Sequence, residues 1–443
     1  MPTEPDRPEF RAAASAVKRL DERGFPTMIV GGAVRDMLIG LAPEDFDLVT
    51  AATPEELAEV FPGLTQLVGA SFGVSLLKWE DAVFEVATAR EERNYLDGRH
   101  PEQVLYSRDL RVDVERRDFT VNALMYDPLR HEVVDHVGGV ADLERGVIRC
   151  VGEPERRFRE DYLRMLRAVR FAGRLGFVLE PATRSALYEL SPLAAQLSGE
   201  RVREELTRIL CSMRAAESLR LMSDSGLLRA VLPEAADLSG VEQPPEFHPE
   251  GDVFEHTALM LKNMVLPTPN LAWSVLLHDI GKAGTARRDD TGRIRFFGHE
   301  QLGAEMASRI LERLRFSSAD RERIVSAVRN HMRFSSVREM RAAKLRRLLA
   351  DDNFALELEL HRLDCLSCHG KLEGFVFLID RLRANDDTAL PEPLIRGRDL
   401  VDAGCGPSPR FGEVLREIYE LQLSGEVSDR GEALRLALER LTR

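Results

Sequence analysis

A glycine pair between a short apolar run and a helical run most constrains how the start of this chain folds. Met28–Val30 predicts a buried strand and Ala33–Ile39 predicts the helix that follows it, with the segment GGAVRD at Gly31–Asp36 between them. Adjacent glycines let a phosphate approach the backbone without a Cβ in the way. The free N–H groups and the dipole at a helix N-terminus favour an anion. The turn at Gly31 and Gly32 therefore predicts a phosphate cradle.

Two carboxylates follow this turn at an alternating spacing. Asp45 and Asp47 alternate with Phe46 and Leu48, and side chains two apart on a strand point to the same face. Mg²⁺ takes hard oxygen ligands and usually keeps substrate phosphates in its shell. Either motif alone is more often a solvated turn or strand end, but their order and close spacing favour a site. Together they predict metal-assisted attack on a nucleotide α-phosphate.

Length and composition exclude several classes of protein. A chain of 443 residues is expected to form about three domains. It contains no run of 18 apolar residues, and its first ten residues, MPTEPDRPEF, lack the features of a signal peptide. Five cysteines without framework spacing fit a reducing cytoplasm. The net charge of −13 argues against indiscriminate nucleic-acid binding but leaves room for a local basic groove. We expect a cytoplasmic protein with no membrane partner.

The chain changes character along its length. The first part mixes short β-type and helical runs: strands are expected at Val74–Trp79, Ala82–Ala87 and Glu132–Val137, and a helix at Pro54–Phe61 after a capping Thr53. Beyond about Glu153 the apolar residues fall at helical spacing, notably over Glu155–Leu175 and Arg201–Arg214. Polar, proline-bearing stretches at Gly240–Asp252 and Leu390–Leu400 indicate two boundaries. The pattern predicts an α/β domain followed by helical regions.

The segment RRDFTVNA, at Arg116–Ala123, supplies a second pair of candidate groups. Arg117 is a planar, permanently charged fork that suits a phosphate. Asp118 is placed to accept a hydrogen bond from a ribose hydroxyl. Taken alone, the segment is more typical of a surface ion pair beside a buried run.

A helical segment, EDYLRMLRAVRF at Glu160–Phe171, predicts a surface that reads a base. If this segment is one helix, its aspartate and its arginines lie on one face: Asp161, Arg164, Arg167 and Arg170. A carboxylate accepts from an exocyclic amine, while arginine donates to base acceptors. Cytosine and adenine present an amine beside a ring acceptor, so an Asp–Arg pair selects them over uracil and guanine. A solvated, salt-bridged helix is the alternative interpretation.

Histidines and aspartates gather in the second half of the chain. The segment LLHDIGK, at Leu276–Lys282, lies at the centre of the cluster His256, His278, Asp279, His299, His331 and Asp364. Such side chains converging from several helices predict a divalent-metal phosphohydrolase site. A lone histidine would more often be a core residue, but the adjacent His–Asp pair followed by Gly281 favours metal.

The ordered motifs GGAVRD, EDFD, RRDFTVNA, DHVGGVADL and EDYLRMLRAVRFAGRLGF resemble those of the class II tRNA nucleotidyltransferases. These are the CCA-adding enzymes and their bacterial poly(A) polymerase relatives. The resemblance covers roughly the first half of the chain. It implies a polymerase-β-type nucleotidyltransferase head (1–150), a helical neck that carries the template motif and binds RNA (151–239), an HD-type body (240–389) and a helical tail (390–443).

The resemblance also assigns roles to these positions. It implies that Asp45 and Asp47 hold catalytic Mg²⁺, that Gly32, Arg35 and the neighbouring Arg117 contact the triphosphate, and that Asp118 meets the ribose. Asp161 and Arg164 would form the protein template, supported by Arg167 and Arg170. The segment Ala89–Pro101 falls at the family's flexible loop and looks full length, which favours addition of the terminal A.

The second half, with HPEGDVFEHT, LLHDIGK and FFGHE, resembles the HD phosphohydrolase domain. His256, His278, Asp279 and Asp364 match its H…HD…D pattern, with His299 and His331 as further ligands of a second divalent metal. This resemblance implies hydrolysis of phosphomonoesters or 2′,3′-cyclic phosphates at tRNA ends.

The expected function is template-independent addition of CCA to tRNA 3′ ends from CTP and ATP, with release of pyrophosphate. No obligate protein partner is evident. Addition of only A or only CC, poly(A) synthesis, and an RNA-binding phosphohydrolase with an inactive head are the alternatives. Intact carboxylates and an intact Asp–Arg pair argue against the last.

Overall fold

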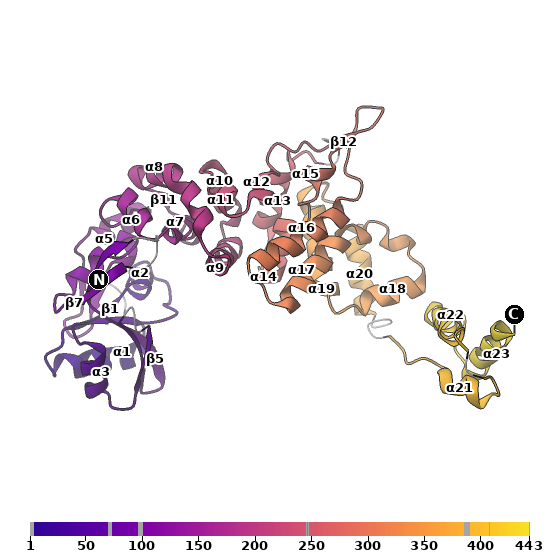
Figure 1. The fold of residues 1–443 in the computed structure, drawn as a ribbon, viewed down its shortest axis with the longest axis horizontal. Coiled ribbons are helices and arrows are strands. Elements are labelled where there is room, and N and C mark those ends of the chain that lie inside the picture. The colour runs from indigo at the N-terminus through magenta and orange to yellow at the C-terminus, as the bar shows by residue number, and fades with distance from the viewer. Residues whose placement is uncertain are drawn as a thin grey trace. The chain divides into compact units, whose positions relative to one another are not determined.

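The computed structural model describes residues 4–69, 73–95, 101–244, 246, 248–384, 390–406 and 408–442. The chain divides into two compact units, Met1–Ala236 and Asp237–Arg443 (Figure 1). The first is the expected α/β domain continued by helices, and the second is almost entirely helical. The division into four regions stays a prediction.

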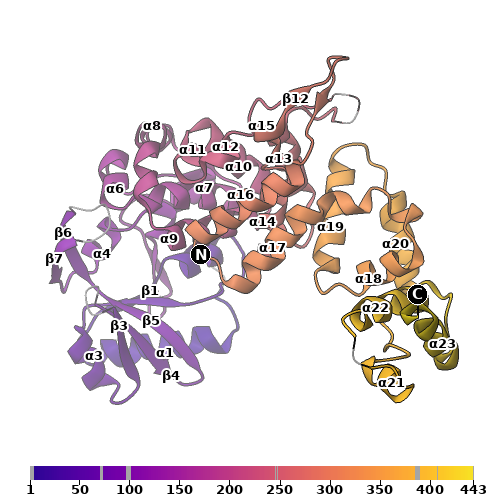
Figure 2. The same cartoon turned by 45° about the vertical axis from the view of Figure 1, so that its right-hand side comes forward.

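A seven-stranded mixed sheet organises the start of the first unit (Figure 2). Its order is β3-β4-β5-β2-β1-β8-β9, with the bounds β1 Thr27–Val30, β2 Asp47–Thr50, β3 Thr65–Gly69, β4 Val74–Trp79, β5 Ala82–Thr88, β8 Met125–Asp127 and β9 Glu132–Val134. β2 pairs antiparallel with β1 and parallel with β5. Helix α1, Pro8–Asp21, packs on β1, β2 and β5 through its buried face. The sheet therefore fixes the start of β2 beside the end of β1.

The predicted elements of this domain form with small changes. Helix α2 spans Gly32–Leu38, and α3 spans Pro54–Val60 behind a Thr53–Glu56 capping box. The expected strand Glu132–Val137 ends early, at Val134. The Asp135 carboxylate accepts hydrogen bonds from the N–H groups of residues 137 to 140, and it thereby turns the chain into helix α5, Gly139–Arg145.

The predicted loop at Ala89–Pro101 is largely a β-hairpin. Strand β6, Arg90–Tyr95, pairs antiparallel with β7, Pro101–Tyr106. Residues Leu96–His100, which include Asp97 and Arg99, lie outside the described residues.

The segment Glu155–Leu175 is helical as its apolar spacing indicates, but Asp161 does not share a helix with the arginines. The segment forms α6, Pro154–Glu160, and α7, Leu163–Leu175, with Asp161 in an extended conformation between them. The Asp161 carboxylate accepts a hydrogen bond from the Leu163 N–H at 3.0 Å, which satisfies a donor that a continuous helix would pair with its own carbonyls. Helix α9, Gly199–Leu210, packs against α7 and ends before the expected Arg214.

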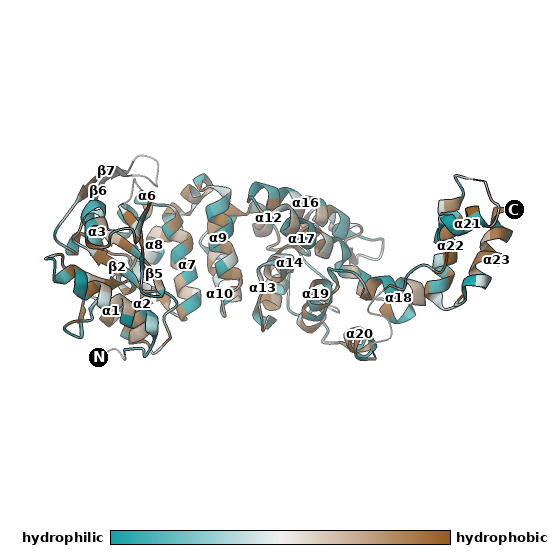
Figure 3. Ribbon diagram, turned by 90° about the horizontal axis from the view of Figure 1, so that it is seen from below, coloured by the Kyte–Doolittle hydropathy of each residue, from teal (hydrophilic) through white to brown (hydrophobic). Residues whose placement is uncertain are grey.

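The second unit surrounds a histidine cluster with helices. The contributing helices are α13 Val253–Asn263, α14 Pro269–Leu277, α16 His299–Arg313, α17 Ser318–Asn330 and α19 Phe354–Ser367. A separate apolar core joins α18, Ala342–Leu349, to α20, Glu373–Arg383, and another joins α21 Gly397–Asp402, α22 Phe411–Ser424 and α23 Arg430–Leu441. Many helices are apolar on one side and polar on the other (Figure 3). Within the described residues, no helix combines the length and hydrophobicity that crossing a membrane requires.

Candidate active site and candidate metal centre

The carboxylates of the first motif lie at the entrance to β2. Asp47 is the first residue of β2, opposite Val30 at the end of β1, and it is half-buried. Asp45 lies before the strand and is exposed, while Phe46 between them is buried. Both carboxylates therefore lie outside the core, next to the turn that begins at Gly31.

A third carboxylate, that of Glu85, lies beside this pair and was not predicted from the sequence. It lies on β5 in the position before Val86, which pairs with Leu48, so it neighbours Asp47 across the parallel strands. An exposed glutamate between buried Phe84 and Val86 is a local signal, since it breaks an apolar run. The pairing of β5 with β2 is what makes it a third carboxylate of the site.

The electrostatics of this group favour a bound cation. Burial, then the charge of Glu85 and more weakly that of Asp45, raise the pKa of Asp47 to about 6, against the opposing effect of Arg117. Clustered carboxylates repel one another when ionised. A divalent ion relieves that repulsion, and oxygen ligands of this kind suit Mg²⁺. The residues present therefore fit the metal that this motif predicts.

Arg117 stands directly over the glycine turn. Gly31 has a φ of 75°, and a Cβ built there would lie 3.0 Å from Arg117 Nη1. The Arg117 guanidinium donates to the Asp113 carboxylate at 2.9 Å and to the Asn122 carbonyl at 3.2 Å. Asp113 is buried, and it also binds Arg116. The positive φ favours glycine at position 31, and a side chain there would also meet the Arg117 guanidinium.

Arg35 lies in a different place from the other predicted phosphate ligands. Its side chain is only 2% exposed, and it donates to Asp36 at 2.7 Å and to the Asn122 side chain at 2.6 Å. This geometry ties α2 to the turn at residues 120–122. These hydrogen bonds hold the glycine turn in place. Contact between Arg35 and a triphosphate stays a prediction.

Asp118 and Arg167 form a close pair between the α/β domain and α7. Arg167 donates to Asp118 Oδ2 at 2.6 Å, and Asn122 and the Phe119 N–H donate to Oδ1. Burial acts to raise the pKa of Asp118, but the charge of Arg167 outweighs it and the pKa is lowered. The carboxylate therefore stays ionised and able to accept from a hydroxyl.

The predicted template residues each have a partner of opposite charge, and they do not pair with one another. Arg201 donates to both oxygens of Asp161, Arg164 donates to Glu160 at 2.8 Å, and Arg170 lies 2.7 Å from Glu205. Arg164 also donates to the Arg116 carbonyl at 3.0 Å. The break at residue 161 separates Asp161 from the helical face of the arginines. Arg201 and Glu205, both on α9, were not predicted.

The second cluster is built around Asp279. His278, His299 and His331 each place Nδ1 at hydrogen-bond distance, 2.8, 2.8 and 2.6 Å, from the carbonyl three residues earlier. Their Nε2 atoms lie 3.1, 3.4 and 3.7 Å from the Asp279 carboxylate, respectively. Metal-binding histidines usually have the second ring nitrogen held in this way. Burial, despite the charge of Asp279, lowers the pKa of His331 to about 4, so that ring stays neutral.

The side chains of the cluster do not satisfy one another's hydrogen-bonding groups, and they are better suited to binding a cation. With Nδ1 donating, each Nε2 presents a lone pair, yet the Nε2 atoms of His299 and His331 are 3.1 Å apart. The His278 Nε2 atom is buried and, among the described residues, has no hydrogen-bond partner. A cation bound among them would relieve the repulsion between lone pairs that face each other and a carboxylate. The residues present therefore fit a divalent metal.

His256 and Asp364 complete the predicted set. His256 Nδ1 lies 2.6 Å from Glu250, and its Nε2 lies 3.2 Å from Asp364. Burial acts to lower the pKa of His256, but Asp364 and Glu250 outweigh it and raise the pKa to about 9. Glu250 was not predicted, because it is far from the His278–Asp279 pair in the sequence and no motif marks it as a ligand.

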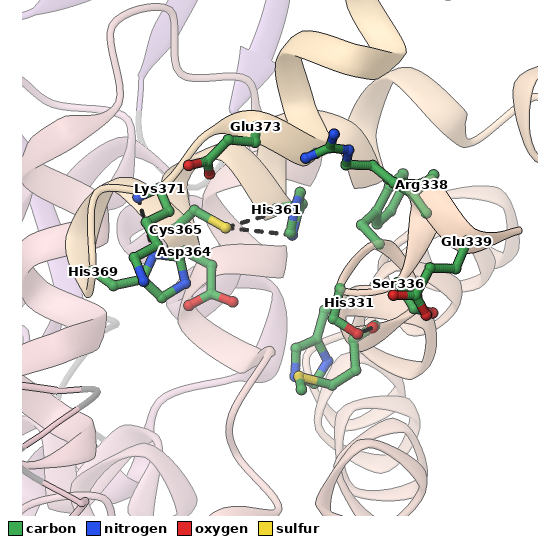
Figure 4. Close-up of a pocket in the computed structure, with 15 residues that line it drawn as sticks. His331, Ser336, Arg338, Glu339, His361, Asp364, Cys365, His369, Lys371 and Glu373 are labelled. Carbon is green, nitrogen blue, oxygen red and sulfur yellow. Dashed lines mark hydrogen bonds between the residues drawn. The ribbon is translucent and has the colours of Figure 1, made fainter.

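Two cavities open beside this cluster, and His331 and Asp364 line both. Figure 4 shows one, of about 430 Å³, into which His331 and Asp364 project from opposite sides. The other, of about 540 Å³, reaches Lys282, Arg293 and Arg295. Lys282 lies 2.6 Å from Asp279. Cations beside a metal-ligand cluster are suited to an anionic substrate.

Three family models match successive parts of the chain. "Poly A polymerase head domain" matches residues 27–149, and "Probable RNA and SrmB- binding site of polymerase A" matches residues 176–238. The third, "HD domain", matches residues 253–367. The first includes the carboxylates and Arg117, the second includes α9, and the third includes the histidine cluster.

The chain is similar to curated proteins and solved structures of one kind. It is 35% identical over 426 residues to an A-adding tRNA nucleotidyltransferase of Deinococcus radiodurans, covering 91% of this chain and 93% of the relative. It is 43% identical to a CCA-adding enzyme of Geobacillus kaustophilus over 230 residues, 52% of this chain and 56% of the relative, so the match spans little more than half of that enzyme. The crystal structure of the Bacillus stearothermophilus CCA-adding enzyme in complex with CTP covers 98% of both chains with a TM-score of 0.77 at 26% identity.

Proposed function

Because the chain belongs to the tRNA nucleotidyltransferase family, we propose that it extends the 3′ ends of tRNA with the nucleotides of the CCA terminus, from CTP and ATP. The observation that carries the proposal is the group Asp45, Asp47 and Glu85 beside a glycine turn covered by Arg117. The resemblance of the fold to a CCA-adding enzyme in complex with CTP supports it. The proposed location of this reaction is the cytoplasm.

In the proposed reaction, the tRNA 3′-hydroxyl attacks the nucleotide α-phosphate and pyrophosphate leaves. Asp45, Asp47 and Glu85 would hold Mg²⁺, which when bound would supply Lewis-acid stabilisation of charge on the reacting phosphate. Arg117 and the turn at Gly31 and Gly32 bind the triphosphate, and Asp118 accepts from the ribose. Arg117 donates a hydrogen bond to the buried Asp113 carboxylate. The guanidinium is therefore already oriented before the nucleotide binds.

Base choice falls to Asp161 and Arg164. The Asp161 carboxylate accepts from the exocyclic amine of cytosine or adenine, and Arg164 donates to the neighbouring ring acceptor. Uracil and guanine present a carbonyl where the amine should be, and two acceptors then face each other. The guanidinium carbons of Arg167 and Arg170, on the same helix as Arg164, lie 5.3 and 4.3 Å from the centre of the Phe171 ring.

Addition of A alone is the second candidate for the head. The match to the A-adding enzyme of Deinococcus radiodurans covers 91% of this chain, while the match to the Geobacillus CCA-adding enzyme covers 52% of it. The two candidates share the chemistry and differ in whether CTP is accepted.

The HD region is proposed to be a second, metal-dependent hydrolytic site. The cluster of three histidines on Asp279, with His256 and Asp364, supports a divalent metal there. Lys282 beside the cluster suits a phosphate group. Phosphomonoesters and 2′,3′-cyclic phosphates at RNA ends are the proposed substrates.

Transfer of labelled AMP to RNA tests the proposed function. We expect incorporation from α-labelled ATP into a tRNA transcript that ends in CC, with one pyrophosphate released per nucleotide. A single-stranded RNA with the same last 12 nucleotides is the control and is expected to be extended far more slowly. Equal extension of both RNAs would contradict a tRNA substrate, because the neck is proposed to recognise the folded shape.

A further inference from the structure

The carboxylate proposed to read the base is held by a residue 40 positions away. Arg201, on α9, places one nitrogen, Nη2, at 3.0 Å from Asp161 Oδ1 and at 2.8 Å from Oδ2. The Leu163 N–H donates to Oδ1 at 3.0 Å. Both side chains are about one-fifth exposed, 20% for Arg201 and 22% for Asp161. The pair is thus shielded, yet Asp161 remains accessible to a ligand.

These contacts fix the direction in which Asp161 accepts hydrogen bonds. An ionised carboxylate offers about four lone-pair sites. Within the described residues, Leu163 and Arg201 occupy two of these sites on Oδ1 and Arg201 occupies one on Oδ2, which leaves a site on Oδ2. An exocyclic amine needs one such acceptor. Without Arg201 the carboxylate keeps only the hydrogen bond from the Leu163 N–H among these contacts, so the direction of Oδ2 is no longer fixed.

Helix α9 contacts the template region at two points, one helical turn apart. Arg201 binds Asp161, and Glu205 lies 2.7 Å from Arg170 on α7. Residues four apart lie on one helix face, and this face of α9 packs against α7. Helix α9 lies in the part of the chain that matches the RNA-binding family model. The RNA-binding region thus supplies the groups that orient the base-reading residues.

We propose that Arg201 is a specificity-determining positioning residue, which acts through Asp161 to select an amino-bearing base. This inference rests on the proposed nucleotidyltransferase function. Arg201 does not itself contact the base: it fixes the direction in which the Asp161 carboxylate accepts a hydrogen bond. Its removal should therefore lower selectivity and raise KM for the correct nucleotide more than it lowers kcat.

The test compares ATP with GTP on a tRNA transcript that ends in CC. The two purines differ at the edge that Asp161 reads, where adenine has an amine and guanine a carbonyl. We expect Arg201→Gln to lower the ratio of kcat/KM for ATP over GTP about tenfold, mainly through KM, and Arg201→Lys to restore part of it. Arg184→Gln, which changes an exposed arginine on the helix Pro181–Leu190, is the control and should leave the ratio unchanged.

A double-mutant cycle separates positioning from general stability. If Arg201 acts through Asp161, Asp161→Ala combined with Arg201→Gln should discriminate no worse than Asp161→Ala alone. Additive losses, or an equal fall for both nucleotides, would overturn the inference. Tighter ATP binding by Arg201→Gln with selectivity intact would also overturn it, since Arg201 would then block Asp161. A wild-type chain that incorporates no nucleotide would overturn the proposed function as well, whereas an unchanged ratio in the variant counts against Arg201 only.

Discussion

Replacement of Asp47 by asparagine is expected to abolish nucleotide addition, with a loss of roughly a thousandfold or more in kcat. The amide keeps the size of the side chain but removes the charge that holds the metal beside the α-phosphate. Glu85→Gln, which changes the carboxylate on the neighbouring strand, should cause a smaller loss of about 10- to 100-fold. Single-turnover extension of a CC-ended tRNA at saturating ATP measures both.

The matched control for these variants is Asp81→Asn. Asp81 is exposed in the turn between β4 and β5, on the same hairpin as Glu85, so its change should leave extension at the wild-type rate. Hydrolysis at the HD region should persist in all three variants, because the two sites belong to different compact units. An Asp47→Asn variant that extends tRNA at a near-wild-type rate would show that these carboxylates are not the metal ligands.

Replacement of Asp279 is expected to have the largest effect on the second site. Asp279→Asn should leave less than about one-tenth of the bound divalent metal and of the phosphatase activity, since this carboxylate faces three histidine Nε2 atoms. The side chain is 3% exposed, and Lys282 loses an anionic partner. A stability loss on the order of 3 kcal/mol is expected for breaking such a buried pair. Metal content by mass spectrometry, hydrolysis of a 2′,3′-cyclic nucleotide and thermal unfolding measure the three effects.

A second variant distinguishes loss of metal from loss of fold. His331→Gln removes one Nε2 ligand without removing the partner of Lys282, and it should also lower the metal content. His131→Gln is the matched control, since His131 is exposed and lies in the first unit. Tight metal retention by both Asp279→Asn and His331→Gln would contradict the proposed centre. Extension of tRNA should be unchanged in each variant.

Residues that act through local geometry were predictable from the sequence. The glycine turn, Asp45 and Asp47 lie within 17 residues of one another, and their strand–helix–strand setting follows from apolar periodicity. The adjacent His278–Asp279 pair, followed by Gly281, directed attention to the histidine cluster. The family resemblance stated from these motifs is confirmed by the relatives, and so is the α/β head followed by helices.

Groups that depend on distant pairing were not predictable. Glu85 becomes a neighbour of Asp47 only through the parallel pairing of β5 with β2. Arg201 reaches Asp161 because α9 packs on α7, and no sequence period links positions 40 apart. The break at Asp161 was missed for a related reason. The helical spacing of apolar residues continues through Asp161. In the structure Asp161 follows the end of α6, and its carboxylate accepts a hydrogen bond from the N–H of Leu163, the first residue of α7.

The most direct test of the central claim is extension of three tRNA transcripts at single-nucleotide resolution. They end at the discriminator base, after one C, or after CC, and CTP and ATP are supplied separately and together with Mg²⁺. We expect a complete CCA end on the shortest transcript, with no nucleotide added beyond the final A. Extension of only the CC-ended tRNA, by one A, would assign the second candidate function. A halt at CC or a long A tail would contradict the assigned specificity, and no incorporation on any transcript would contradict the nucleotidyltransferase itself.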